Sequence, residues 1–280
     1  MPVNVEEGGH QKVCMLSMCG VHQGPFHLIS TTSTVILQPY IQWFESPAAR
    51  ELFEFQDTTS AVSQAYQRAL AMVLENEVRV VLLSSLNDQV VSLAELLSGS
   101  VADGQVPIYG SSFSAASHPL LLRALFVDGA SYSASDFMTN LLCFSFMLRN
   151  AGISDQHLIE HLSEATAGSL TGVGHSTPYE EPASFALAVD YLFHAAPLNG
   201  PSPELMLDHF SAREGRNDFE LPWIMRALVD SPEIKDLFPG ELRDLKEGVL
   251  HWKPTTKALK DIKRKVSAAL STGTCIRIDY

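Results

Sequence analysis

The sequence predicts an α/β protein built on a parallel sheet. Three observations support this prediction. An apolar run stopped by glycine, at residues 10–20, is typical of a buried strand. Apolar residues at helical spacing follow at 58–77, and then comes a β-branched run, VRVVLLSS, at 78–85. Strand, helix and strand in this order indicate parallel strands joined by a crossover helix.

The remainder of the chain reads as further helices and loops. A helix is expected through QVVSLAELLS, and a loop rich in small residues at about 98–117. We expect helices at 136–150, 154–167 and 182–195. The segment PLNGPSP then breaks the chain, and the sequence beyond it is mainly helical, with amphipathic segments such as DFELPWIMRALV.

Composition and charge narrow the class of protein. With 280 residues, 46% hydrophobic and 18% charged, the chain can bury a sizeable core. A net charge of −13 argues against nucleic acid as a partner, because phosphates repel an acidic protein. One basic stretch, at 257–265, runs against this balance. It is interpreted as the solvated side of a terminal helix, with a docking patch as the alternative.

Cysteine use and hydropathy predict a cytoplasmic protein. The four cysteines lack CxxC spacing and lie in apolar surroundings, so they are expected to be reduced; they are Cys14, Cys19, Cys143 and Cys275. The N-terminal residues contain no apolar signal segment. The most apolar stretch, 137–152, is too short and too polar to be a transmembrane segment. We expect no cofactor.

A metal site is one candidate chemistry. The segment HLIEH, from His157 to His161, matches the H-x-x-E-H pattern of inverted zincins, with Glu180 or Glu181 available as a third ligand. Two histidines four residues apart also arise easily on an amphipathic helix, and a five-residue match is weak without fold context. We therefore expect no metal site, with zinc as the alternative.

An acid–base pair is the second candidate. Asp88 comes directly after an apolar strand, where parallel sheets present functional side chains. His175 lies on a glycine-flanked turn, where its ring could approach a substrate. A carboxylate that orients an imidazole is the arrangement that triad chemistry requires. The alternatives are that Asp88 is a helix N-cap and that His175 is an ordinary loop histidine.

A nucleophile is harder to find. The pattern G-x-S-x-G does not occur in the chain, and the nearest segments are GSSFS at 110–114 and GSLTG at 168–172. Cys14 lies within a predicted strand, and Cys19 at its end. An acid and a base without a nucleophile cannot complete acyl transfer through a covalent intermediate.

Several long segments together resemble a known family. They include KVCMLSMCGVHQGPF, VRVVLLSSLNDQVVSLAELL, LTGVGHSTPYEE and HWKPTTKALKDIK. In this order they are similar to the C-terminal half of large fungal α/β-hydrolase-fold proteins of the serine-hydrolase or lipase-like kind. The resemblance extends from about Lys12 to Lys265.

The resemblance implies roles for four residues. The family's acid and base match Asp88 and His175. The segment GVHQGPF would lie near the site, so His22 is a binding candidate, with an ordinary loop residue as the alternative. Asn87, beside the acid, is the other binding candidate. The substrate would be a small ester or a lipid.

The resemblance also implies that an element is missing. The family's nucleophile elbow lies upstream of the strand matching KVCMLSM, and Met1 stands only a few residues before that strand. We therefore expect a truncated parallel sheet and a chain that is inactive alone, completed by an upstream half or a second chain. A non-catalytic scaffold is the alternative. The expected domains are a partial α/β-hydrolase domain at 1–196, with lid-like helices at about 118–167, and a helical extension at 197–280.

Overall fold

The structure is a computed structural model. It describes residues 12–20, 22, 51, 54–55, 57–85, 116–126, 137–159, 161–162, 177–195, 204–209 and 219–270.

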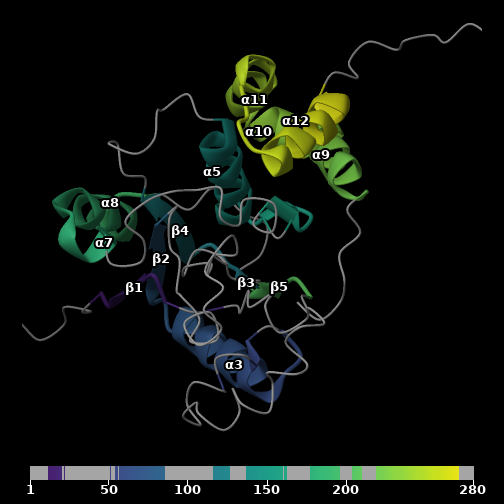
Figure 1. The fold of residues 1–280 in the computed structure, drawn as a ribbon. Coiled ribbons are helices and arrows are strands. Elements are labelled where there is room, and N and C mark those ends of the chain that lie inside the picture. Colours follow the sequence, from purple (N-terminus) through teal and green to yellow (C-terminus); the bar gives the residue numbers. More distant parts are fainter. Residues whose placement is uncertain are drawn as a thin grey trace, which may run out of the picture.

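A three-stranded parallel sheet forms the centre of the fold (Figure 1). Its strands are β1 (Cys14–Met18), β2 (Arg79–Ser85) and β4 (Leu121–Phe126), in the order β1-β2-β4. β2 is the middle strand, and its apolar run VVLLSS is buried throughout, as expected for a strand covered on both faces. The α/β prediction is confirmed.

Helices cover both faces of this sheet. On one face, Leu70 and Leu74 of α3 (Ala61–Glu75) pack against Val80 and Leu82 of β2. On the other face, α8 (Pro182–Phe193) packs through Ala188. The strand side chains alternate between these two faces because the side-chain period of a strand is two residues.

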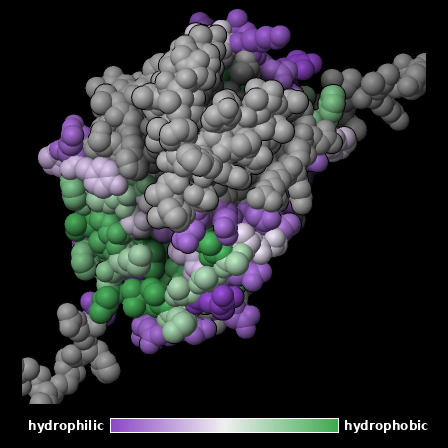
Figure 2. Space-filling model, turned by 60° about the horizontal axis from the view of Figure 1, so that its bottom comes forward, coloured by the Kyte–Doolittle hydropathy of each residue, from purple (hydrophilic) through white to green (hydrophobic). Residues whose placement is uncertain are grey.

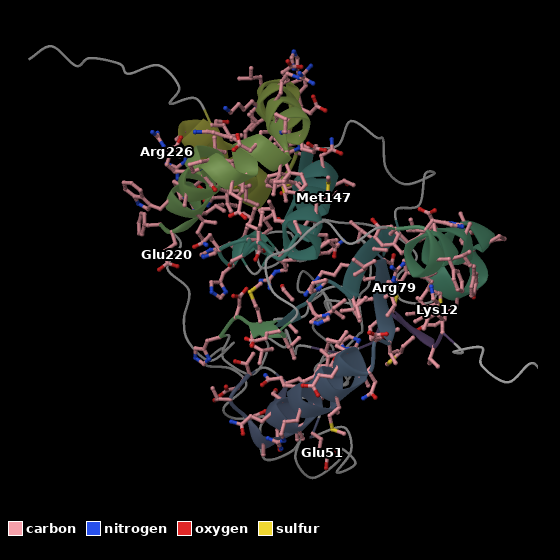
Figure 3. All side chains as sticks on the ribbon, turned by 180° about the vertical axis from the view of Figure 1, so that it is seen from behind. Lys12, Glu51, Arg79, Met147, Glu220 and Arg226 are labelled. Atoms are coloured by element: carbon pink, nitrogen blue, oxygen red, sulfur yellow. The ribbon has the colours of Figure 1, made fainter. Side chains whose placement is uncertain are left out.

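Local signals explain where these helices begin and end. The side chain of Ser60 accepts a hydrogen bond from the backbone N–H of Ser63 and so caps the start of α3. The end of α8 is bound by Arg79, the first residue of β2. Arg79 donates hydrogen bonds to the carbonyl oxygens of Tyr191 and Leu192, at 3.4 and 3.0 Å. Figure 3 shows Arg79 beside α8. A cation at a helix C-terminus is favourable, so β2 helps to fix α8 on the sheet.

The C-terminal part of the chain is helical and shares its core with α5 (Phe137–Asn150). The helices are α9 (Leu221–Asp230), α10 (Pro232–Leu237), α11 (Pro239–His251) and α12 (Lys257–Leu270). α5 in turn contacts β4, so the helical region is attached to the sheet through it. The expected domain boundary near residue 196 stays a prediction.

The basic stretch lies on α12. Its apolar residues Ile262 and Val266 are buried, whereas Lys257 and Lys260 are exposed. Lys263 donates hydrogen bonds to carbonyl oxygens at the end of α11, those of Leu250 and Trp252. The exposure of Lys257 and Lys260 fits the interpretation of a solvated helix side, whereas Lys263 packs against the end of α11.

Two elements differ from the sequence prediction. The stretch 118–167, expected to hold lid-like helices, contains β4 as well as α5. The run LLLRALF is apolar without a clear period, and such a run does not distinguish a buried strand from a buried helix. A short antiparallel pair, β3 (Ala116–Ser117) with β5 (Met206–Leu207), was also not predicted. The expected helix at 89–98 lies outside the described residues.

The remaining expectations concern thiols and membranes. Cys14, Cys19 and Cys143 are free thiols, and Cys275 lies outside the described residues. Within the described ranges, none of the helices combines the length and apolar character needed to cross a bilayer.

Candidate active site at the carboxyl edge of the sheet

The carboxyl ends of β1 and β2 lie side by side. Met18 pairs with Leu83, and the backbone N–H of Cys19 donates a 2.7 Å hydrogen bond to the carbonyl of Leu83. Cys19 then adopts a φ of 49°, in the left-handed region, so the chain turns sharply as it leaves the strand. Ligands of parallel α/β sheets bind outside the carboxyl ends of the strands, which makes this edge the place for a site.

Three side chains form a continuous hydrogen-bonded chain at this edge. The Oγ of Ser17 lies 2.9 Å from Nε2 of His22, and Nδ1 of His22 contacts the phenolic oxygen of Tyr66. We call these three residues the hydroxyl relay. It joins β1 to α3 across the turn, and each of its members is half-buried.

Gly20 makes the hydroxyl relay sterically possible. A Cβ at this position would lie 2.5 Å from Oγ of Ser17 and 3.3 Å from Nε2 of His22. The first distance is far below van der Waals contact, so any other residue at this position would displace the hydroxyl or the ring.

Electrostatics keep the hydroxyl relay neutral. Burial, and then the positive charge of Arg123, lower the pKa of His22 to about 4. Burial raises the pKa of Tyr66 well above its ordinary value, although Arg123 opposes this shift. The imidazole and the phenol are therefore both uncharged near neutral pH.

Arg123 supplies the positive charge. It lies on β4 in the same cross-strand row as Leu82 and Ser17, so its side chain projects from the same face of the sheet as Ser17. The guanidinium is fully buried and donates to the carbonyl of Ala116. Burial, and to a smaller extent the positive charge of Arg149, lower the pKa of Arg123 to about 9. The guanidinium therefore stays protonated at neutral pH.

A buried ion pair lies behind Arg123. Arg149, at the end of α5, is 2.6 Å from Oδ1 of Asp155 and 3.0 Å from Oδ2 of Asp208. Asp155 also accepts a hydrogen bond from the backbone N–H of Ile159. Arg149 and Asp155 are both almost completely buried, so the loss of either would leave a buried charge without its nearest partner.

Three of the four predicted site residues, Asn87, Asp88 and His175, lie outside the described residues. The fourth, His22, is the centre of the hydroxyl relay. Sequence analysis did not single out Ser17, Tyr66 or Arg123. The available signal was a serine and an arginine inside two strands that are otherwise apolar.

The described contacts of His157 and His161 do not bring the two histidines to a common metal site. His157 is exposed with a φ of 63°, and His161 lies 3.5 Å from the carboxylate of Glu220. Figure 3 shows Glu220 close to the start of α9. Among the residues that the structure describes, no three His, Cys, Asp or Glu side chains gather as a metal site would require.

The fold is that of an α/β protein, with a parallel sheet, helices on both faces and polar residues at the carboxyl edge. The profile of the YMC0/YMC35 alpha/beta hydrolase domain matches residues 4–98 and 95–232. The chain therefore belongs to this α/β-hydrolase family. Comparison with curated proteins and with solved structures gave no significant match.

Proposed function

We propose that this chain provides the acid, Asp88, and the base, His175, of a serine ester hydrolase. In this reaction the imidazole takes the proton of a nucleophilic hydroxyl, and the carboxylate orients the imidazole and stabilises its charged form. The substrate would be a small ester or a lipid, and His22 and Asn87 would contribute to its binding.

One contact carries this proposal. The phenolic oxygen of Tyr179, on α7 (Thr177–Glu180), donates a 2.7 Å hydrogen bond to the carbonyl of Met18, the last residue of β1. His175 precedes the start of α7 by two residues, which span at most about 7 Å of extended chain. The helix that follows the base is thus held at the carboxyl edge of β1.

The end of β2 supports a place for the acid at the same edge. β2 ends at Ser85, beside the end of β1, and Asp88 follows three residues later. Three residues reach at most about 11 Å. The chain lengths therefore allow both Asp88 and His175 to lie at the carboxyl edge of β1 and β2. An acid–base pair requires such proximity.

The nucleophilic serine is proposed to come from another segment or another chain. Among the described strands, β1 is at the edge of the sheet. Its sequence, CMLSM, contains no charge and no proline. Met15 and the preceding Val13 are 44% and 56% exposed. An apolar edge strand without charge or proline is suited to pairing with a further strand.

The outer side of α8 supports the same proposal. Phe185, Val189 and Phe193 lie at helical spacing and are 45%, 47% and 64% exposed. Figure 2 shows hydrophobic side chains gathered in a patch on one face of the molecule. The helix therefore offers an apolar surface next to β1, where an added strand would bring its own apolar side chains.

The acid–base pair can be tested by NMR on the 15N-histidine-labelled 280-residue chain. If Asp88 faces His175, the pKa of His175 lies above 6.5, and Asp88→Asn lowers it. Asp244→Asn, at an exposed site on α11, serves as the matched control and leaves it unchanged. A His175 pKa that does not respond to Asp88→Asn would contradict the proposal.

Ester hydrolysis tests the reaction itself. We expect the chain alone to hydrolyse p-nitrophenyl butyrate no faster than the uncatalysed reaction. Turnover should be seen when a segment bearing the serine is supplied. His175→Ala then abolishes this turnover. Equal rates for the unmodified chain and His175→Ala would overturn the proposal, and the scaffold alternative predicts no turnover in either.

A further inference from the structure

Cations are concentrated where α11 meets α12, and Figure 1 shows these two helices at the opposite end of the molecule from α3. Six of the 19 Lys and Arg residues of the chain fall between positions 253 and 265, with one acid, Asp261, among them. The chain as a whole is acidic, with a net charge of −13. We propose that this corner docks on a membrane surface that carries anionic lipid headgroups, a role independent of the proposed acid–base chemistry.

The contacts of Lys263 bring the end of α11 and the start of α12 together. Its Nζ lies 3.4 Å from the carbonyl oxygen of Leu250. Lys260 precedes Lys263 by one helical turn, and Lys257 precedes Lys260 by another, so these side chains are neighbours on α12. Lys253 follows Leu250 by three residues. These residues form one surface, which we call the basic corner: Leu250, Lys253, Lys257, Lys260 and Lys263.

The basic corner presents positive charge to solvent. Lys253, Lys257 and Lys260 are exposed, and no carboxylate within the described ranges forms an ion pair with any of the three. The acid of this stretch, Asp261, lies 2.6 Å from the guanidinium of Arg264 instead. The charges of the three lysines are therefore available to an anionic partner.

The residue types favour a lipid surface over a protein or a nucleic acid. Protein interfaces are enriched in arginine and aromatic residues and depleted in lysine, and single-stranded nucleic acids are bound through stacked aromatic rings. The basic corner carries lysines, and the ring of Trp252 packs against Phe137, with 5.0 Å between the ring centroids. Lysines beside an exposed aliphatic side chain are typical of segments that bind anionic membranes. Leu250, which is 70% exposed, is that side chain.

The acidic character of the whole chain is compatible with this docking. Charges that lie farther from a surface than the Debye length, about 8 Å at physiological ionic strength, are largely screened. The lysines of the basic corner would be within this distance of the headgroups, whereas most of the acidic residues would not. The net negative charge then disfavours other orientations, so the protein would dock through the basic corner.

Vesicle flotation of the 280-residue chain tests the proposal. We expect binding to phosphatidylcholine vesicles that contain about one-third phosphatidylserine, no binding to pure phosphatidylcholine, and release as salt is raised from about 0.1 to 1 M. Lys257→Gln with Lys260→Gln should weaken binding by about 25-fold, because each lysine at an anionic surface contributes about fivefold. Equal binding of this variant and the unmodified chain, or of the two kinds of vesicle, would overturn the proposal, as would binding to neither.

A matched variant controls for the change in net charge. Lys12→Gln with Arg68→Gln removes the same two charges from exposed sites before β1 and on α3. Figure 3 shows Lys12 far from the helical region around Arg226. This variant should bind anionic vesicles as the unmodified chain does, and thermal unfolding checks that both double variants are folded. An equal loss of binding in the two variants would show that net charge alone matters and would overturn the proposal.

Leu250→Ala distinguishes a lipid surface from a soluble acidic partner. We expect about fivefold weaker binding to anionic vesicles, because less apolar surface enters the headgroup region. Met72→Ala, at a 63% exposed site on α3, is the matched control and should have no effect. Unchanged vesicle binding by Leu250→Ala, or binding of polyglutamate or an oligonucleotide at least as tight as that of the vesicles, would overturn the assignment to a membrane.

Discussion

Tyr179 and Met18, 161 residues apart in the sequence, are joined by a hydrogen bond from the phenol to the strand carbonyl. The contact links a short helix to the end of an edge strand. Since α7 is only four residues long, it cannot be stable by itself and depends on such tertiary contacts.

Tyr179→Phe tests the importance of this contact. We expect it to lower the free energy of unfolding by about 0.5–1 kcal/mol, because the phenol is half-exposed and one neutral hydrogen bond is lost. The larger effect should be local. Amide hydrogen exchange in α7 should be faster in the variant than in the unmodified chain, and exchange in α11 should stay the same. Unchanged exchange in α7 would show that other contacts hold the helix.

Gly20→Ala should disrupt the hydroxyl relay. The added methyl group would lie 2.5 Å from Oγ of Ser17, so the hydroxyl or the turn must move. We expect a loss of stability of about 1–3 kcal/mol, the usual cost of overpacking, and altered 15N shifts of His22. Gly240→Ala is the matched control, since a Cβ there meets no atom within 4 Å. A stable Gly20→Ala variant with unchanged His22 shifts would contradict the described geometry.

The buried ion pair of Arg149 and Asp155 should matter far more than exposed pairs. Asp155→Ala leaves the guanidinium of Arg149 buried without its nearest carboxylate, and removal of one partner of a buried pair typically costs about 3–5 kcal/mol. Arg243→Ala, which removes an exposed pair with Asp244 on α11, should have little measurable effect. Urea unfolding compares the two, and similar losses would mean that Asp208 compensates for Asp155.

The sequence predicted the strand β2 and the helix α3 because each shows a clear period and clear ends. β4 was not predicted as a strand, since an apolar run that includes Arg123 has no alternation to read. The family resemblance supplied the wider fold, which the matching hydrolase profile confirms. Periodicity alone indicated only parallel strands with crossover helices.

The hydroxyl relay could not be predicted from sequence because it depends on tertiary packing. Ser17 and Tyr66 come together only once α3 packs on the sheet. Arg123 reaches the same face because the register places it in one row with Leu82 and Ser17. His22 was a candidate through family resemblance alone. The pairing of Asp88 with His175 stays a prediction.

His22 should make the stability of the protein depend on pH. Its pKa is about 4 in the folded chain and about 6.5 when unfolded, so the unfolded chain binds more protons between these values. The stabilisation is complete above about pH 6.5 and is lost as the pH falls towards 4. Between pH 7 and 5 this corresponds to about 2 kcal/mol.

His22→Gln isolates this contribution from that of the carboxylates. The variant lacks the titrating ring, so its free energy of unfolding should fall by about 2 kcal/mol less than that of the unmodified chain between pH 7 and 5. His194→Gln, at a ring that is 71% exposed on α8, should follow the unmodified chain. Urea unfolding at the two pH values gives the comparison. Parallel pH dependences for the unmodified chain and His22→Gln would show that His22 is not held neutral between Ser17 and Tyr66.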